Sequence, residues 1–183
     1  MTRVLLDCDG VLSNFVESAL EFIYLHTNVL HRAEDVLDHD TFGYLGVKHL
    51  EEKLKDEIDR YAWCYNLQPF SGAKQGVRRL SKVSEVVVVT APFHADGWVP
   101  QREDWLWDHM MIPRSRIVHT KNKGLVGGDF LVDDKVENCI EWGNANPHGT
   151  PIIWDRPYNR GEKSRGIVRV HTWDELHDIV AGS

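Results

Sequence analysis

The chain has 183 residues, of which 42% are hydrophobic and 27% are charged, and its formal net charge is −7. This balance predicts one globular domain with room for an insertion, and it argues against binding to a nucleic-acid polymer, which requires a basic face. The cysteines are Cys8, Cys64 and Cys139, too widely spaced for a disulfide framework or a zinc site, so we expect a reducing, cytoplasmic location. No apolar run approaches the ~18 residues of a membrane span, so we expect neither a signal peptide nor membrane contact.

The first predicted element is a short buried strand over residues 4–6, and it ends in two carboxylates, Asp7 and Asp9. Gly10 follows at once and allows the chain to turn sharply past the strand end. Open α/β sheets bind their ligands at the carboxyl ends of strands, where paired acids can hold a divalent cation or attack phosphorus. Taken alone, the motif fits a strand that ends in polar turn residues about equally well.

The interval 13–67 is predicted to be helical and contains no convincing strand. Residues 14–26 form a predicted helix with Ser13 as its cap, and residues 47–60 carry apolar side chains at helical spacing with charges opposite. We therefore expect a small helical cap at 13–67, inserted after the first strand. Residues 1–12 and 68–183 would form the core domain.

Strands and helices alternate through the rest of the chain, which is typical of a parallel sheet covered on both faces. The sequence thus predicts an α/β fold, a Rossmann-like three-layer α/β/α sandwich. Four valines in a row mark the most buried strand. The expected strands are 86–89, 116–119, 130–132 and a last core strand at 151–154, and the expected helices are 72–82, 97–110, 136–142 and 172–181.

Polar side chains follow three further strands at the point where each strand ends. Thr90 offers a hydroxyl beside the amide of Ala91, Lys123 offers a cation, and Asp133 and Asp134 add two acids. Each of these residues taken alone is more often a plain turn or surface residue. Together, at one edge of the sheet, they predict a metal-assisted phosphate site, and the oxygen-rich donor set favours Mg²⁺.

The order of these motifs resembles the haloacid dehalogenase superfamily of phosphotransferases: DCDGVL at 7–12, VVTAP at 88–92, a lone lysine, and LVDDK at 131–135. More narrowly, the chain is similar to the cytosolic and mitochondrial 5′(3′)-deoxyribonucleotidases and their bacterial and phage relatives. The narrower match rests on Asn14-Phe15 after the first motif, on Leu67-Gln68-Pro69 with Gly72-Ala73, and on Thr120-Lys121-Asn122-Lys123 ten residues before Asp133. The resemblance covers most of residues 3–155.

The resemblance implies a role for each residue of the site. Asp7 would be the nucleophile, and Asp9 would protonate the leaving oxygen and then deprotonate the attacking water. Thr90 and the amide of Ala91 would bind phosphate oxygens, and Lys123 would neutralise the phosphate.

The resemblance also implies a Mg²⁺ site. Asp7, the backbone carbonyl of Asp9, Asp133 and Asp134 would hold the cation, with Asp134 as the first choice for direct contact. The implied activity is that of a phosphoric monoester hydrolase acting on a small phosphorylated substrate, a nucleoside monophosphate.

The cap is expected to select the substrate. Phe15 matches the family position that packs on the base, whereas Phe42 is followed by Gly43 where the family has tryptophan. A stacking wall is therefore either missing or supplied by Tyr44 or Trp63. Phe15, Phe42 and Trp63 are all equally well explained as cap core. Lys121 stands where relatives often carry arginine, a change that removes a bidentate donor.

Two other functions remain open from the sequence. The chain could be a phosphatase of the same superfamily for another small ester such as a sugar phosphate. It could also be a non-catalytic protein that binds a phosphorylated ligand or a partner, although the presence of both Asp7 and Asp9 argues against this. The seven tryptophans leave a homodimer open as well.

Overall fold

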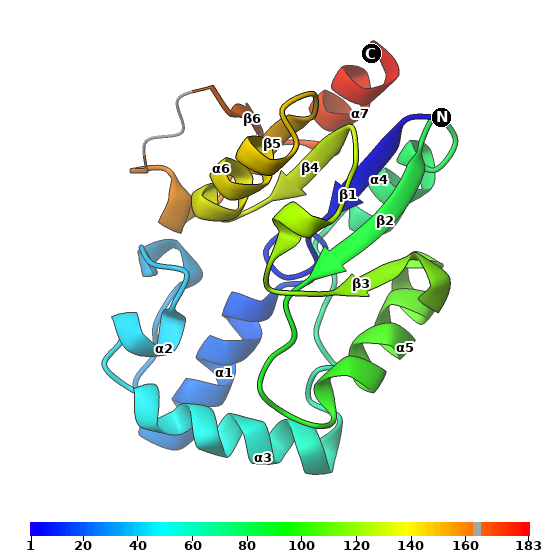
Figure 1. Ribbon diagram of the computed structural model, residues 1–183. Coiled ribbons are helices and arrows are strands. Elements are labelled where there is room, and N and C mark those ends of the chain that lie inside the picture. Colours follow the sequence, from blue (N-terminus) through cyan, green and yellow to red (C-terminus); the bar gives the residue numbers. More distant parts are fainter. Residues whose placement is uncertain (163–165) are drawn as a thin grey trace.

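Six parallel strands form one sheet in the order β3-β2-β1-β4-β5-β6 in the computed structural model, which describes residues 1–162 and 166–183 (Figure 1). Each pair of neighbouring strands is parallel. The predicted α/β fold is therefore confirmed. The strands are β1 (Arg3–Leu6), β2 (Glu85–Thr90), β3 (Ile117–His119), β4 (Phe130–Asp133), β5 (Thr150–Trp154) and β6 (Val168–Val170).

Helices cover both faces of the sheet, because alternate strand residues point to opposite faces and both sets are apolar. Val4 and Leu6 face one cluster, which α4 (Ala73–Leu80), α5 (Trp98–Met110) and α7 (Trp173–Ala181) close. Leu5 faces the opposite side, where Trp142 of α6 (Val136–Ala145) packs. The central strands are thus fully enclosed, and only their carboxyl ends are available for chemistry.

The strand β6 was not predicted, since residues 151–154 were expected to form the last strand of the sheet. β6 pairs with β5 at the sheet edge and is only three residues long. Arg169 interrupts its apolar character and forms an ion pair with Asp155, with 2.8 Å between Nη1 and Oδ1. A strand this short with a charged central residue lacks the apolar run that identified the other strands.

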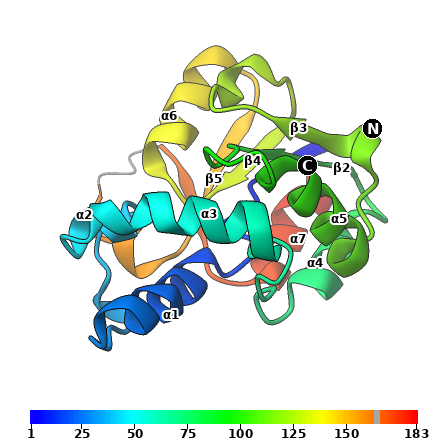
Figure 2. The same ribbon diagram turned by 90° about the horizontal axis from the view of Figure 1, so that it is seen from below.

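Three α-helices lie within residues 13–67, ahead of α4: α1 (Phe15–Thr27), α2 (Thr41–Tyr44) and α3 (Glu51–Tyr61). They gather at the carboxyl end of the sheet and cross in front of it when seen from below (Figures 1 and 2). Their buried side chains form a cluster of their own, which Trp98 of α5 completes. The division into a core domain and a cap at 13–67 stays a prediction.

The cap of α1 differs from the prediction. Asn14, not Ser13, is the N-cap residue, and its Oδ1 accepts a hydrogen bond from the backbone N–H of Glu17 at 3.4 Å. Ser13 lies one residue earlier, with its side chain fully buried and turned toward the loop after β1. Its hydroxyl donates a hydrogen bond to Oδ1 of Asp9 at 2.6 Å.

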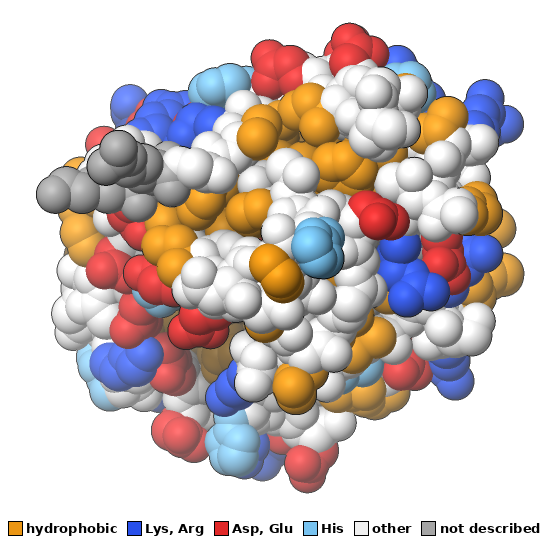
Figure 3. All heavy atoms as spheres, turned by 45° about the horizontal axis from the view of Figure 1, so that its top comes forward, with side chains coloured by type: hydrophobic (Ala, Val, Ile, Leu, Met, Phe, Trp, Pro, Cys, Tyr) orange, Lys and Arg blue, Asp and Glu red, His pale blue; other side chains and the backbone are white. Residues whose placement is uncertain are grey.

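The face drawn in Figure 3 carries charged side chains of both signs. On the face drawn in Figure 3, lysine and arginine side chains are interspersed with aspartate and glutamate and form no continuous basic area. Among the described residues, no helix combines the length and the apolar character needed to cross a membrane.

Candidate active site

The loop after β1 places two carboxylates at the floor of a cavity. The backbone N–H of Asp7 continues the ladder to Val132 at 2.9 Å, and the chain then turns at Gly10, whose φ is +78°. A Cβ at Gly10 would overlap the carboxylate of Asp134 and lie 2.8 Å from the hydroxyl oxygen of Tyr158. Glycine is thus required both for the left-handed backbone and for the close approach to Asp134.

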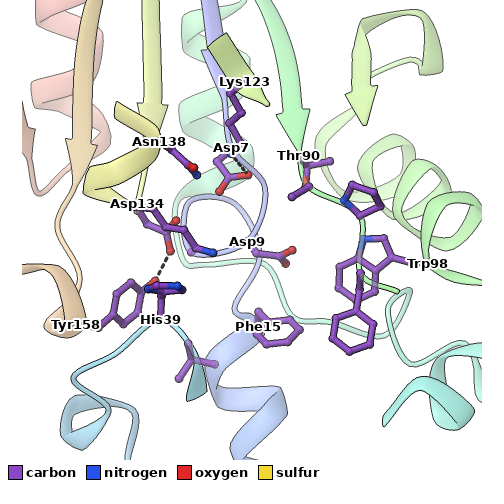
Figure 4. A pocket seen from close by; sticks show the side chains of 16 residues that line it. Asp7, Asp9, Phe15, His39, Thr90, Trp98, Lys123, Asp134, Asn138 and Tyr158 are labelled. Atoms are coloured by element: carbon purple, nitrogen blue, oxygen red, sulfur yellow. Dashed lines mark hydrogen bonds and ion pairs between the residues drawn. The ribbon is translucent and has the colours of Figure 1, made fainter. Parts of the chain in front are cut away.

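Three buried acids, Asp7, Asp133 and Asp134, form a cluster beside Lys123, and Figure 4 shows Asp7 and Asp134 together with the lysine. Oxygen atoms of Asp7, Asp133 and Asp134 all lie within 4.8 Å of one another. The Nζ of Lys123 lies 2.8 Å from Oδ1 of Asp7 and 2.5 Å from Oδ2 of Asp133. One cation among three carboxylates leaves the cluster with an excess of negative charge.

Asp133 is occupied by protein donors on both oxygens. Besides Lys123, it accepts hydrogen bonds from the backbone N–H of Lys135 at 2.8 Å and from Nδ2 of Asn138, at 3.1 Å to each oxygen. Its side chain is completely buried. Asp133 therefore positions Lys123, and it is less available to a cation than Asp7 and Asp134 are.

Burial and mutual repulsion shift the pKa values of the cluster. Burial, together with the charges of Asp133 and Asp9, raises the pKa of Asp7 from 3.8 to about 6, although Lys123 opposes the change. Burial and the neighbouring carboxylates of Asp7 and Asp133 also raise the pKa of Asp134. Burial opposes the charge on Lys123, but Asp133 and Asp7 outweigh it and raise the pKa of the lysine. Lys123 is hence a permanent cation, and the charge of Lys135 offsets the rise in the pKa of Asp134 only in part.

The donor set fits a divalent cation. Oδ1 of Asp134 is buried and has no hydrogen-bond partner among the described residues, while its Oδ2 accepts the hydroxyl hydrogen of Tyr158. Asp7 uses Oδ1 for Lys123 and for the N–H of Cys8 at 2.7 Å, so that its other oxygen remains for a ligand. All three potential ligand atoms of the cluster are carboxylate oxygens, a donor set that suits a hard ion such as Mg²⁺.

Asp9 stands apart from the acid cluster. Its Oδ1 accepts hydrogen bonds from Oγ of Ser13 at 2.6 Å and from Nη2 of Arg102 at 2.7 Å. The side chain is 27% exposed and faces the same cavity as Asp7. The two acids of the first motif therefore have different surroundings, which suits two different chemical roles.

The cavity has a volume of about 240 Å³ and joins the acid cluster to an aromatic wall (Figure 4). Thr90 and Ala91 border it at the end of β2, opposite Asp134. Phe15, Phe93 and Trp98 form the aromatic side. The structure thus brings together seven of the residues predicted for the site: Asp7, Asp9, Phe15, Thr90, Ala91, Lys123 and Asp134. Asp133 does not line the cavity but contacts Lys123.

Two predicted cap residues do not reach this cavity. Phe42 is buried in the cap cluster, with its ring centroid 6.4 Å from that of Phe22. Trp63 packs edge-on against Phe15 at 5.6 Å between centroids and borders a separate hollow next to α1. Both side chains support the cap, and the aromatic residues at the cavity are Phe15, Phe93 and Trp98 instead.

Several residues of the cavity were not predicted. Tyr158 lies in the short turn after β5, so the rule that selected Lys123 after β3 could have selected it too, whereas Asn138 lies on helix α6. His39 reaches the cavity from an exposed segment of the cap, beside Tyr158 in Figure 4, and nothing in the sequence around it signals this position.

The comparisons with known proteins agree with this geometry. The family model described as 5′ nucleotidase, deoxy (Pyrimidine), cytosolic type C protein matches residues 1–182. The chain belongs to this nucleotidase family. Membership, together with its named relatives, makes it a phosphoric monoester hydrolase.

Relatives of this nucleotidase family member span nearly its whole length. The 5′(3′)-deoxyribonucleotidase of Bacillus subtilis is 25% identical and covers 94% of this chain and 95% of its own. The human cytosolic 5′(3′)-deoxyribonucleotidase is also 25% identical, over 99% of this chain and 96% of its own. In fold, the chain resembles a haloacid dehalogenase-superfamily hydrolase of Geobacter sulfurreducens, with a TM-score of 0.58, 15% identity and coverage of 98% and 96%.

Proposed function

We propose that this protein is a Mg²⁺-dependent phosphatase that hydrolyses nucleoside 5′-monophosphates, with 2′-deoxy pyrimidine forms as preferred substrates. The observation that carries the proposal is the position of Asp7, which is buried against Lys123 and next to Asp134 at the floor of a cavity with an aromatic wall. The relatives named 5′(3′)-deoxyribonucleotidases support the choice of substrate.

In the first step, the free oxygen of Asp7 attacks phosphorus. The P–O5′ bond breaks, its electron pair stays on O5′, and O5′ takes the proton carried by Asp9. The products of this step are the free nucleoside and an aspartyl-phosphate on Asp7.

In the second step, water attacks the phosphorus of the aspartyl-phosphate. Asp9, now a carboxylate, accepts the proton of the water, and the P–O bond to Asp7 breaks. Inorganic phosphate leaves, and Asp7 and Asp9 return to their starting states.

The remaining residues make the approach of an anion to Asp7 feasible. Lys123 neutralises the phosphate charge, while the hydroxyl of Thr90 and the amide of Ala91 bind its other oxygens. Asp133 holds Lys123 in place. Asp7, Asp134 and the backbone carbonyl of Asp9 would bind Mg²⁺. The cation would supply positive charge that offsets the repulsion between the carboxylate of Asp7 and the phosphate dianion.

The cavity favours a monophosphate that carries a base. A triphosphate would add negative charge beside the acid cluster, and Lys123 is the only cation that the described structure places within hydrogen-bonding distance of that cluster. The partly exposed rings of Phe15 and Phe93 offer apolar surface to a base, whereas a hexose phosphate has nothing to stack.

Phe15→Ala is expected to raise KM for dTMP by about tenfold, the equivalent of losing one base-stacking contact. KM for deoxyribose 5-phosphate, which has the same sugar without a base, should change less than twofold. Steady-state phosphate release measures both. Tyr24→Ala is the matched control, since it removes a half-exposed aromatic ring from the same helix without touching the cavity.

The same assay with a substrate panel tests the proposed function directly. We expect kcat/KM for dUMP and dTMP to exceed that for nucleoside triphosphates and hexose phosphates. A preference for a sugar phosphate, or an equal effect of Phe15→Ala on dTMP and deoxyribose 5-phosphate, would leave a phosphatase but exclude a nucleotidase.

A further inference from the structure

A completely buried arginine in α5 contacts the loop that carries both acids of the first motif. The side chain of Arg102 has no exposed surface, and its Nη2 lies 2.7 Å from Oδ1 of Asp9. Its Nη1 donates to Oγ of Ser13 at 3.0 Å and to Sγ of Cys8 at 3.1 Å. One guanidinium thus contacts three residues of the loop between β1 and α1.

The surroundings of Arg102 hold the guanidinium in one orientation. Its central carbon lies 4.7 Å from the ring centroid of Trp98 and 5.6 Å from that of Trp105. These rings come from the preceding and following turns of the same helix, and both are buried. The planar guanidinium packs against both rings. Its N–H groups therefore lie in one plane and are directed toward Asp9 and Ser13.

A buried ion pair is a poor way to stabilise a fold, because desolvation of the two charges offsets most of their attraction. An apolar residue between Trp98 and Trp105 would pack as well. The presence of arginine here therefore calls for a reason connected with Asp9.

The contacts at Asp9 suggest that reason. Oδ1 accepts from both Arg102 and Ser13, while among the described residues no hydrogen bond reaches Oδ2. Since Asp9 borders the cavity, the oxygen free of protein donors is the one available to a substrate. A proton carried by Asp9 is then placed on Oδ2, because Oδ1 already has two donors directed at it.

We propose that Arg102 is a positioning residue that fixes the carboxyl group of Asp9 so that Oδ2 faces the leaving oxygen of the substrate. This inference rests on the proposed function, in which Asp9 donates the proton to O5′. Arg102 touches neither the substrate nor the phosphate, and it acts through Asp9, with Ser13 as the second donor.

Dependence on the leaving group distinguishes this role from a purely structural one. A nucleoside alkoxide is a poor leaving group that needs the proton of Asp9, whereas p-nitrophenolate departs without one. kcat/KM reports the steps up to release of the leaving group, so it is the quantity to compare. Arg102→Met should lower kcat/KM for dTMP by about 10²-fold, the lower end of a general-acid contribution, and that for p-nitrophenyl phosphate by less than fivefold.

Three further variants keep the test decisive even if Arg102→Met is unstable. Ser13→Ala removes the other donor to Oδ1 and should give the same selectivity with a loss of about fivefold for dTMP. Arg102→Lys should recover part of the loss, since it restores a cation near Asp9. Gln101→Met is the matched control: it changes the neighbouring residue of α5, which bonds to the carbonyl of Ile58 and to the N–H of Cys64, and should leave both substrates unaffected.

A double-mutant cycle with Asp9→Asn completes the test. If Arg102 acts through Asp9, Arg102→Met should lower kcat/KM for dTMP no further in the Asp9→Asn background. Losses that multiply, or an equal loss for both substrates in Arg102→Met and Ser13→Ala, would overturn the positioning role alone. Equal losses for both substrates in Asp9→Asn itself would instead overturn the proposed acid role of Asp9, and this inference with it.

Discussion

Asp7→Asn is expected to reduce turnover of nucleoside monophosphates by at least ~10³-fold, a loss comparable to that caused by removal of other covalent nucleophiles. The amide keeps the shape of the side chain but cannot attack phosphorus. Steady-state phosphate release from dTMP with saturating Mg²⁺ measures the effect. Turnover within tenfold of the unmodified protein would exclude Asp7 as the nucleophile.

The same substitution is expected to stabilise the metal-free protein. A higher Tm of Asp7→Asn would show that its loss of activity is not caused by unfolding. The pKa of Asp7 is raised from 3.8 to about 6, so above pH 6 the folded protein must hold a charge that the unfolded chain holds more easily. Asparagine removes this penalty, which is on the order of 1–3 kcal/mol.

The sign of the effect depends on pH. Below the ordinary pKa, Asp7 is protonated in both the folded and the unfolded chain, so the advantage of asparagine should vanish near pH 4. It should grow between pH 4 and 6 and stay constant above. Thermal unfolding of both proteins with chelator across this range measures the difference, and a lower Tm of Asp7→Asn at pH 8 would contradict the account of the acid cluster.

Removal of divalent cations is expected to abolish activity, and added Mg²⁺ to restore it. Of three clustered buried carboxylates only Asp7 and Asp133 pair with Lys123, and within the described part of the chain Oδ1 of Asp134 has no hydrogen-bond partner. A second cation should therefore be needed before a phosphate dianion can enter. Full turnover of dTMP in excess chelator would refute the proposed metal requirement.

Stability provides an independent readout of the same metal. Because the cation would bind the folded chain and neutralise the repulsion among the acids, Mg²⁺ should raise Tm in a concentration-dependent way. Asp134→Asn should remove most of that increase. Asp129→Asn, which changes an acid at the opposite end of β4, is the matched control and should respond to Mg²⁺ as the unmodified protein does.

Much of the site could be predicted from the sequence because its residues follow apolar strands directly. Asp7, Thr90 and Asp133 each come at the end of a buried strand, and parallel strands all end at the same edge of the sheet. The topology alone then brings them together. Tyr158 obeys the same rule and could have been included.

Residues that approach the cavity from helices could not be predicted in this way. Phe15 and Phe42 lie on cap helices that bury apolar side chains in their own cluster, and an aromatic residue on such a helix has the same pattern whether it faces the core or the cavity. Arg102 could not be predicted in this way either, since its burial depends on Trp98, Trp105 and the loop after β1, which are brought together only by tertiary packing.

The stereochemistry of phosphoryl transfer tests the central claim, a covalent intermediate on Asp7, most directly. A nucleoside 5′-phosphorothioate made chiral at phosphorus with oxygen isotopes is hydrolysed in isotopically labelled water, and the configuration of the released thiophosphate is determined. Attack by Asp7 and then by water inverts phosphorus twice, so the account predicts overall retention of configuration. Overall inversion would mean that water attacks the substrate directly, and it would contradict the assignment of Asp7 as the nucleophile.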